Sequence, residues 1–185
     1  MSLILASASP RRAELLTSAG FIFEVAAANV DETPAPDEAP EVYALRVAEQ
    51  KASAAAARRA RHGDILAADT VVAAGGAILG KPADKADAAR MLRLLSGGVH
   101  QVHTAVVVIN GVTVDRSEVV TTQVRFVPLS DAEIAWYVAS GEPAGKAGAY
   151  AIQGRGARFI DWIEGSWSNV VGLPIATVYR LLGRP

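Results

Sequence analysis

The chain has 185 residues, of which 51% are hydrophobic, 20% charged and 6% aromatic. These proportions are typical of a globular protein and exclude the disordered, collagen-like and coiled-coil classes. Eighteen basic and nineteen acidic side chains give a net charge of -1. No overall field therefore attracts a nucleic-acid polymer, and a strongly anionic partner needs a local cluster of cations. We expect one domain over residues 1–185.

Cysteine is absent, which excludes disulfides, thiolate metal sites and a cysteine nucleophile. Any metal must therefore use oxygen or imidazole ligands. The N-terminal residues contain no basic segment, and no apolar stretch reaches the roughly 18 to 20 residues that cross a membrane. We expect a cytoplasmic protein without a membrane partner.

The spacing of apolar residues predicts strands alternating with helices. In chain order these are a strand at 3–6, helices at 11–18 and 41–61, strands at 65–73 and 77–79, a helix at 85–95, strands at 102–109 and 119–127, and helices at 131–140 and 174–182. Helix starts are indicated by Ser9 with Pro10 at the first helical position, by Asp84, and by the capping box of Ser130 and Glu133.

Two turn signals indicate antiparallel pairs. Gly75 and Gly76 separate two apolar runs, and Asn110-Gly111 is typical of a two-residue hairpin. Because helices alternate with strands while these hairpins are antiparallel, the sequence predicts an α/β fold with a mixed twisted sheet flanked by helices. Neither the dinucleotide-binding nor the P-loop glycine motif occurs.

Two segments before the first long strand have a distinctive composition. Residues 30–40 are rich in Pro, Asp and Glu and predict an exposed loop whose acidity is compatible with simple solvation. The helix at 41–61 is rich in Ala, and Lys51 falls away from the centre of its predicted apolar stripe. That stripe consists of Val42, Leu45, Ala48 and Ala52.

The first candidate site lies where the first strand meets a helix. Ser7, Ser9, Arg11 and Arg12 bring two hydroxyls and two guanidinium groups to free backbone N–H groups, which suits an anion. The alternative is an ordinary N-cap followed by surface arginines. Cations in the first helical turn are disfavoured by the helix dipole, which favours a bound anion.

The second candidate is Asp69, a carboxylate inside the apolar run at 65–73. Burying it costs several kcal/mol unless it meets a metal, a cation or hydrogen-bond donors. It is a metal ligand or a general base, or else it is satisfied by backbone N–H groups. Asp31 and Glu32 offer a second carboxylate, although by themselves both suit a solvated loop.

The remaining candidates come from lysines and glycines. Only four of the eighteen basic residues are Lys, and Lys51, Lys81 and Lys146 have distinctive surroundings, although each alone is typical of a surface. Gly154 follows Gln153, and Gly154 and Gly156 flank Arg155, which indicates close backbone approach to a flat or charged group. The three histidines lack metal-ligand spacing and suit the core edge or the surface.

Together these segments resemble the Maf family of nucleoside triphosphate pyrophosphatases. The match includes S-x-S-P-R-R at 7–12 and K-A-G-x-Y-x-I-Q-G at 146–154, both highly specific. The matching blocks follow the family order at 5–16, 31–32, 46–52, 68–72, 79–82, 95–97, 146–154 and 168–174. The resemblance implies a fold like that of inosine triphosphate pyrophosphatases, with an active-site cleft between two lobes, often in a homodimer.

The resemblance also implies an activity and residue roles. The activity is hydrolysis of a nucleoside triphosphate between the α and β phosphates, assisted by Mg²⁺ or Mn²⁺. The implied proton acceptor or metal-linked carboxylate is Asp69, with Glu32 as the second metal-linked carboxylate. The implied phosphate and metal surroundings are Ser9, Arg12, Glu32, Lys51 and Lys81. The implied base-specificity positions are Arg11, Thr70 and Gln153.

Gln153 bears on the choice of base. Its amide can accept from the N–H of uracil or thymine and donate to a carbonyl, which favours dTTP and UTP, with CTP or modified pyrimidine nucleotides as further substrates in a house-cleaning role. A related subfamily that acts on 7-methyl-GTP has Glu at this position. The family's link to septum formation and cell division arrest leaves another alternative, a nucleotide-binding regulator without important turnover.

Overall fold

The computed structural model describes residues 3–58, 63–110 and 114–183. The strands are β1 (Leu3–Leu5), β2 (Phe23–Val25), β3 (Asp64–Ala74), β4 (Ala77–Leu79), β5 (Val99–Asn110), β6 (Val114–Phe126) and β7 (Ile160–Glu164). The α-helices are α1 (Pro10–Ser18), α2 (Pro40–Ala57), α3 (Lys85–Leu95), α4 (Asp131–Ala139), α5 (Trp167–Val171) and α6 (Ile175–Leu181). Two 3₁₀ helices are η1 (Ala147–Ala149) and η2 (Gly154–Phe159).

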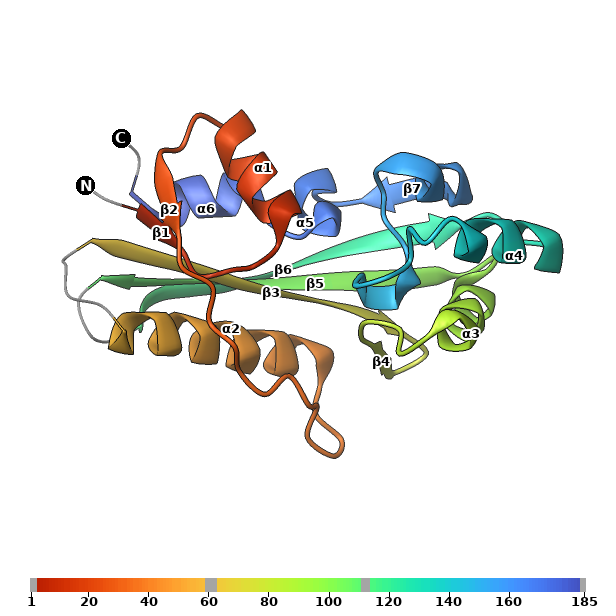
Figure 1. Cartoon of the computed structure of the whole chain (residues 1–185), viewed down its shortest axis with the longest axis horizontal. Coiled ribbons are helices and arrows are strands. Elements are labelled where there is room, and N and C mark those ends of the chain that lie inside the picture. Colours follow the sequence, from red (N-terminus) through yellow and green to blue (C-terminus); the bar gives the residue numbers. More distant parts are fainter. Residues whose placement is uncertain (1–2, 59–62, 111–113, 184–185) are drawn as a thin grey trace. The chain divides into compact units, whose positions relative to one another are not determined.

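The strands form one seven-stranded sheet in the order β2-β1-β3-β5-β6-β7, with β4 also paired with β3 (Figure 1). β1 is parallel to β2 and β3, whereas β4 is antiparallel to β3 and β7 is antiparallel to β6. The predicted mixed sheet is therefore confirmed. The Gly75-Gly76 turn joins β3 to β4 as predicted, whereas Gly111 lies outside the described residues.

The chain divides into two compact units. The first comprises residues 1–70, 104–120 and 172–185, and the second comprises residues 71–103 and 121–171. The long strands β3, β5 and β6 each contribute residues to both units. No helix in the described part of the chain is long and apolar enough to span a membrane.

In the first unit, helices cover both faces of the strands. α1 and α6 lie on one face and α2 lies on the other (Figure 1). Leu66 and Ala68 of β3 share a buried cluster with Leu16 of α1 and with Val178 and Leu181 of α6. Since neighbouring strand residues point to opposite faces, the odd-numbered residues in the first-unit part of β3, residues 65–69, face α2.

The orientation of α2 differs from the prediction. Val42, expected in the apolar stripe, is 58% exposed. The buried side chains of the helix are instead Tyr43, Ala44, Val47, Ala48, Lys51, Ala52 and Ala55. Lys51 therefore lies within the buried stripe. The sequence did not predict this, because alanines occur on all sides of the helix and leave its apolar face poorly defined. Residues 59–62, which include His62 and the end of the predicted helix, lie outside the described residues.

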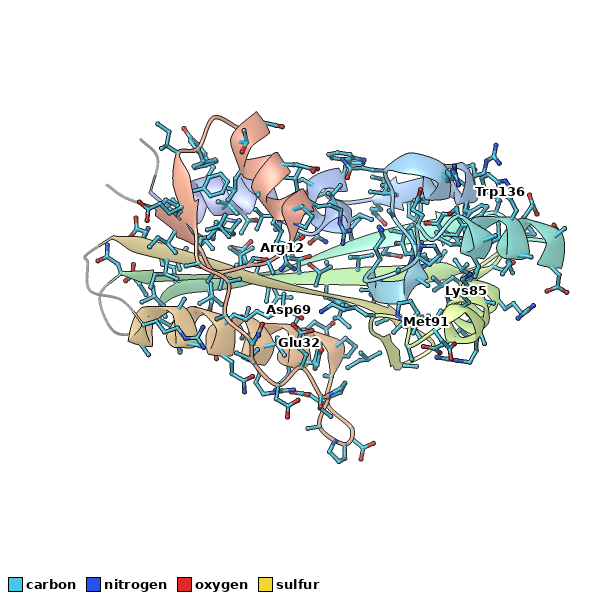
Figure 2. All side chains as sticks on the ribbon, in the orientation of Figure 1. Arg12, Glu32, Asp69, Lys85, Met91 and Trp136 are labelled. Atoms are coloured by element: carbon cyan, nitrogen blue, oxygen red, sulfur yellow. The ribbon has the colours of Figure 1, made fainter. Side chains whose placement is uncertain are left out.

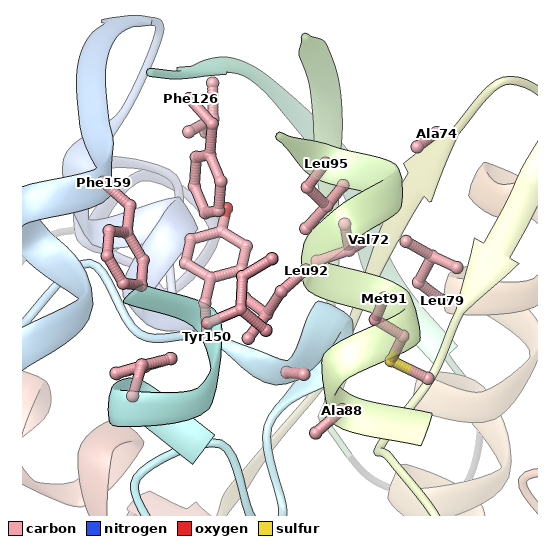
Figure 3. Packing of buried hydrophobic residues seen from close by; sticks show 14 of the residues in the cluster. Val72, Ala74, Leu79, Ala88, Met91, Leu92, Leu95, Phe126, Tyr150 and Phe159 are labelled. Carbon is pink, nitrogen blue, oxygen red and sulfur yellow. The ribbon is translucent and has the colours of Figure 1, made fainter. Parts of the chain in front are cut away.

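The core of the second unit packs α3 and α4 around aromatic residues (Figure 3). Phe126 contacts the rings of Tyr150 and Phe159. The predicted helix starts are present, since Asp84 accepts from the backbone of Asp87, and Ser130 with Glu133 forms a capping box. Local sequence signals thus define these helices well.

His100 is a polar member of this core. It is 2% exposed, lies edge-on to Phe126 and shares a 2.8 Å hydrogen bond with the hydroxyl of Tyr150. Burial lowers the pKa of His100 to about 4 from an ordinary value of 6.5. The unfolded chain therefore binds a proton at this residue in a pH range where the folded chain does not.

We expect the free energy of unfolding to fall by about 2 kcal/mol between pH 7 and pH 5, because protonation of His100 favours the unfolded chain as the pH drops through 6.5. Urea titrations at both pH values measure this change. The control is His100→Gln, which can still bond to Tyr150 but does not titrate. An equal loss in both proteins would contradict the assignment to His100.

Candidate active site

Asp69 and Thr70 are successive residues of β3 and therefore point to opposite faces of the strand. Asp69 faces α2 and is 7% exposed. Thr70 lies on the side of α1, where it accepts a hydrogen bond from Arg12 (3.0 Å). Figure 2 shows Arg12 on one side of the strand and Asp69 with Glu32 on the other. One strand thus supplies two polar clusters.

Lys51 joins two carboxylates on the α2 side. Its Nζ lies 2.6 Å from Oδ1 of Asp69 and 2.7 Å from Oε1 of Glu32. The side chains of Lys51 and Asp69 are 10% and 9% exposed, whereas that of Glu32 is 34% exposed. The structure therefore brings these three predicted site residues together around one ammonium group.

The acidic loop is tied to α2, so simple solvation does not describe it. The Tyr43 hydroxyl donates to the backbone oxygen of Glu32 (2.8 Å). Arg46 donates to both carboxylate oxygens of Glu38 (2.7 Å each) and to the Thr33 carbonyl (3.1 Å). Burial, with the negative charges of Asp69 and Glu32, raises the pKa of Tyr43 to about 12. Tyr43 therefore stays protonated and can keep donating.

Arg12 forms the second cluster. Its Nε donates to the Gly172 carbonyl (2.8 Å), Nη1 to Ser7 Oγ (3.0 Å) and Nη2 to Thr70 Oγ1. Burial lowers the pKa of Arg12, whereas the nearby carboxylate of Asp69 acts to raise it. Thr70 Oγ1 also lies 2.9 Å from Thr104 Oγ1. Arg12 thus links the first helix, β3 and the segment at Gly172.

Ser9 and Arg11 lie at the start of α1. Ser9 occupies the N-cap position with extended backbone, and Pro10 follows in the first turn as predicted. The Ser9 side chain makes no capping hydrogen bond, while its backbone N–H donates to Ser7 Oγ (3.2 Å). Arg11 is partly buried in the first helical turn. The predicted cap is thus correct in position but uses no hydroxyl bond.

Lys81 and Gln153 belong to the second unit, whereas the other predicted site residues belong to the first. Lys81 is exposed and comes two residues after β4. The preceding carbonyl, of Gly80, accepts from the Gly148 N–H (3.1 Å), which joins two of the matching blocks. Gln153 is exposed and lies directly before η2.

The glycines around Gln153 do mark a close approach to a charged group. The Glu142 carboxylate accepts from the backbone N–H groups of Arg155 and Gly156, at 3.0 Å each. A Cβ placed on Gly154 would lie 2.9 Å from Glu142 Oε2. The charged group is therefore part of the protein itself.

A shallow hollow of about 530 Å³ lies beside this carboxylate in the second unit. The indole of Trp136, which is 42% exposed, forms one of its walls. The guanidinium groups of Arg155 and Arg158 lie 5.8 and 4.6 Å from the indole centre. These arginines therefore cover part of the exposed ring by cation–π contacts.

The described residues include no group of three or more histidine or acidic side chains that would hold a metal by itself. Mg²⁺ is commonly held by one or two carboxylates together with substrate phosphates. Asp69 and Glu32, which both contact Lys51, fit that smaller donor set.

Sequence reasoning missed several residues that shape these clusters. Tyr43 and Thr104 gave no signal, because one reads as a helix residue and the other as part of an apolar strand. Tyr137 and Glu142 were also missed, although the glycines at 154 and 156 indicated that some group approaches there. Hydrogen bonds to residues outside their own helix, strand or loop define all four.

Comparison with known proteins identifies the family. Residues 2–184 match the model of the Maf-like proteins, so the chain belongs to that family. It is 53% identical to a dTTP/UTP pyrophosphatase of Anaeromyxobacter dehalogenans, over 98% of this chain and 93% of the relative. Relatives of the same name from Koribacter versatilis and Geobacter sulfurreducens are 51% and 50% identical, over 100% and 98% of this chain and 94% and 95% of the relatives.

A solved structure of a nucleoside-triphosphatase / dITP/XTP pyrophosphatase from Mycobacterium abscessus also matches. The match covers 98% of this chain and 95% of that chain, with 16% identity and a TM-score of 0.46. This likeness is too low to indicate a function.

We expect Arg12→Lys to lower the free energy of unfolding by roughly 2 to 4 kcal/mol, because one ammonium cannot replace a planar fork that reaches three acceptors. The matched control is Arg11→Lys, for which we expect a change within about 0.5 kcal/mol. Urea unfolding of both variants measures the difference. Equal stabilities would contradict the linking role of Arg12.

Proposed function

We propose that this protein hydrolyses dTTP and UTP to the nucleoside monophosphate and pyrophosphate, acting as one Maf-like domain in the cytoplasm. Family membership and the names of relatives about 50% identical over nearly the whole chain support this function. The structural observation that carries it is Lys51 held between the carboxylates of Asp69 and Glu32. CTP and modified pyrimidine nucleotides fit the same chemistry, in a house-cleaning role.

Charge neutralisation is the first task of such a site. A bound triphosphate brings about four negative charges, and phosphoryl transfer depends mainly on positioning and electrostatic stabilisation. We assign the positive charge to Arg11, Arg12, Lys51 and Lys81, with Ser9 as a hydroxyl donor to phosphate. Because three N–H groups of Arg12 already donate within the protein, its main role is to orient Thr70 and Ser7.

Asp69 is the proposed general base. Its carboxylate is buried and oriented by the 2.6 Å contact with Lys51, so it has a fixed direction in which to accept a proton from the attacking water. Transfer of the Lys51 ammonium from the carboxylates toward substrate phosphate would release that oxygen for the proton. Tyr43 holds the backbone of Glu32 during this exchange.

A divalent cation, Mg²⁺ or Mn²⁺, would be held by Asp69 and Glu32. When bound, it neutralises phosphate charge and orients the triphosphate. Two carboxylates beside one ammonium have a surplus negative charge, which suits a cation that takes its remaining ligands from substrate and water.

Selection of the base is assigned to Gln153, Thr70 and Arg11. The Gln153 amide offers one donor and one acceptor, which matches the N–H and carbonyl pattern of uracil and thymine. Thr70 is oriented by Arg12 and Thr104. The Gln153 amide is therefore complementary to a pyrimidine edge, whereas it offers only one acceptor to the two donors of a guanine edge.

We expect Asp69→Asn to lower the turnover of dTTP and UTP by about 100-fold or more, because an amide cannot accept the proton of water. Pyrophosphate release with and without Mg²⁺ measures this loss. The control is Asp64→Asn, which removes a carboxylate from the same strand.

The same assay separates this enzyme from the alternative, a nucleotide-binding regulator of septum formation. If wild type and Asp69→Asn bound nucleotide equally well and neither released pyrophosphate from any nucleoside triphosphate, the regulator hypothesis would replace the proposed function.

We expect Gln153→Glu to lower dTTP and UTP turnover more than tenfold, because the carboxylate loses the donor for a pyrimidine carbonyl and leaves that group unpaired. The substitution should favour 7-methyl-GTP, whose base presents two donors. Steady-state rates with the three triphosphates test this. Unchanged rates would exclude Gln153 from base selection, and a wild-type preference for 7-methyl-GTP would support that alternative activity.

A further inference from the structure

The backbone that follows Gln153 is hydrogen-bonded to the carboxylate of Glu142. Glu142 Oε2 accepts from the Arg155 N–H and Oε1 accepts from the Gly156 N–H, both at 3.0 Å. Two successive backbone donors on one carboxylate fix both the position and the orientation of that part of the chain.

The same network holds the segment before Gln153. The hydroxyl of Tyr137 donates to Glu142 Oε1 (2.9 Å) and accepts from the Ala151 N–H (3.2 Å). Tyr137 is fully buried and lies edge-on to Phe159 at a centroid distance of 5.0 Å. Because the ring is packed in the core, the position of the hydroxyl is fixed. It binds the backbone before Gln153 directly, and it orients the carboxylate that binds the backbone after Gln153.

The glycines of this segment provide the space that the network requires. A Cβ on Gly156 would lie 2.4 Å from the Ala151 carbonyl and 2.8 Å from the Tyr137 hydroxyl, and one on Gly154 would lie 2.9 Å from Glu142 Oε2. Any side chain at these positions would displace the backbone or the carboxylate. The glycines thus allow the close approach of the network.

Glu142 is ionised at neutral pH. Burial acts to raise its pKa, but the N–H groups of Arg155 and Gly156, the Tyr137 hydroxyl and the charge of Lys146 outweigh burial and lower it. Hydrogen bonds to an ionised acceptor are about twice as strong as those between neutral groups. The network therefore has its strongest form under the conditions in which the enzyme would act.

We propose that Glu142 and Tyr137 are positioning residues that set the base selectivity of the nucleotide site by fixing the backbone on both sides of Gln153. This inference rests on the proposed function. An amide distinguishes one base edge from another only while its donor and acceptor stay in register with that edge, and small displacements reduce such discrimination. The phosphates are assigned to other residues, so selectivity depends on this network more than catalysis does.

The test is the ratio of kcat/KM for dTTP to kcat/KM for 7-methyl-GTP in Glu142→Ala. We expect the ratio to fall at least tenfold, with KM for dTTP rising more than kcat falls. A variant that only folds less well would lose the same fraction of activity toward both substrates and leave the ratio unchanged. Hydrogen exchange of the Arg155 and Gly156 amides should become faster in the same variant.

Glu133→Ala is the matched control. It removes a carboxylate from the capping box of α4, so it should lower stability without changing the ratio. Tyr137→Phe keeps the buried ring and removes only the hydroxyl, and it tests the network if Glu142→Ala does not fold. We expect a smaller fall in the ratio for Tyr137→Phe, in the same direction.

An active wild-type enzyme whose ratio is unchanged in Tyr137→Phe and in folded Glu142→Ala would overturn this inference alone. A similar fall in Glu133→Ala would also overturn it, since the effect would then follow from helix stability. Wild-type protein that releases pyrophosphate from neither dTTP nor UTP would overturn the proposed function and this inference with it.

Discussion

A carboxylate on a buried strand needs a compensating charge, and the first unit is organised around that need. Asp69 is itself buried and follows the fully buried Ala67 and Ala68 on β3, where an unpaired charge would be strongly destabilising. Lys51 supplies the counter-charge, but its own burial requires α2 to pack with that side chain toward the sheet. Glu32 then adds a second carboxylate to the same ammonium. The packing of α2 is thus determined by a polar pair as well as by apolar contacts.

On the opposite face of the same strand, the buried charge is a cation instead of a carboxylate. Arg12 is buried on α1, and its guanidinium is satisfied by neutral oxygens of Ser7, Thr70 and Gly172. A planar cation bound to fixed acceptors keeps these segments in place, although they come from three distant parts of the chain. The Lys51 cluster and the Arg12 cluster are therefore separated by one strand. In the proposed mechanism, Lys51 would therefore change its partners while Arg12 keeps its own.

Much of this organisation is predictable from sequence where the signals are local. The mixed sheet, the caps at Asp84 and Ser130 and the buried position of Asp69 all follow from short patterns. The orientation of α2 does not, because alanine on every side of a helix leaves its apolar face undefined. The contacts of Glu142 are equally difficult to predict, since two of its donors are backbone N–H groups, which no residue type indicates. Contacts between a side chain and the backbone of another segment become visible only in the three-dimensional structure.

The alternation of side chains along β3 gives this strand an unusual intolerance of changes in length. Inserting or deleting one residue before Asp69 would shift every following side chain to the other face of the sheet. An insertion would place the carboxylate on the side of Arg12, whereas a deletion would place the Thr70 hydroxyl on the side of Lys51. Substitutions elsewhere in the strand change the packing only locally, whereas a one-residue indel here would separate Asp69 from Lys51 and Thr70 from Arg12 at once.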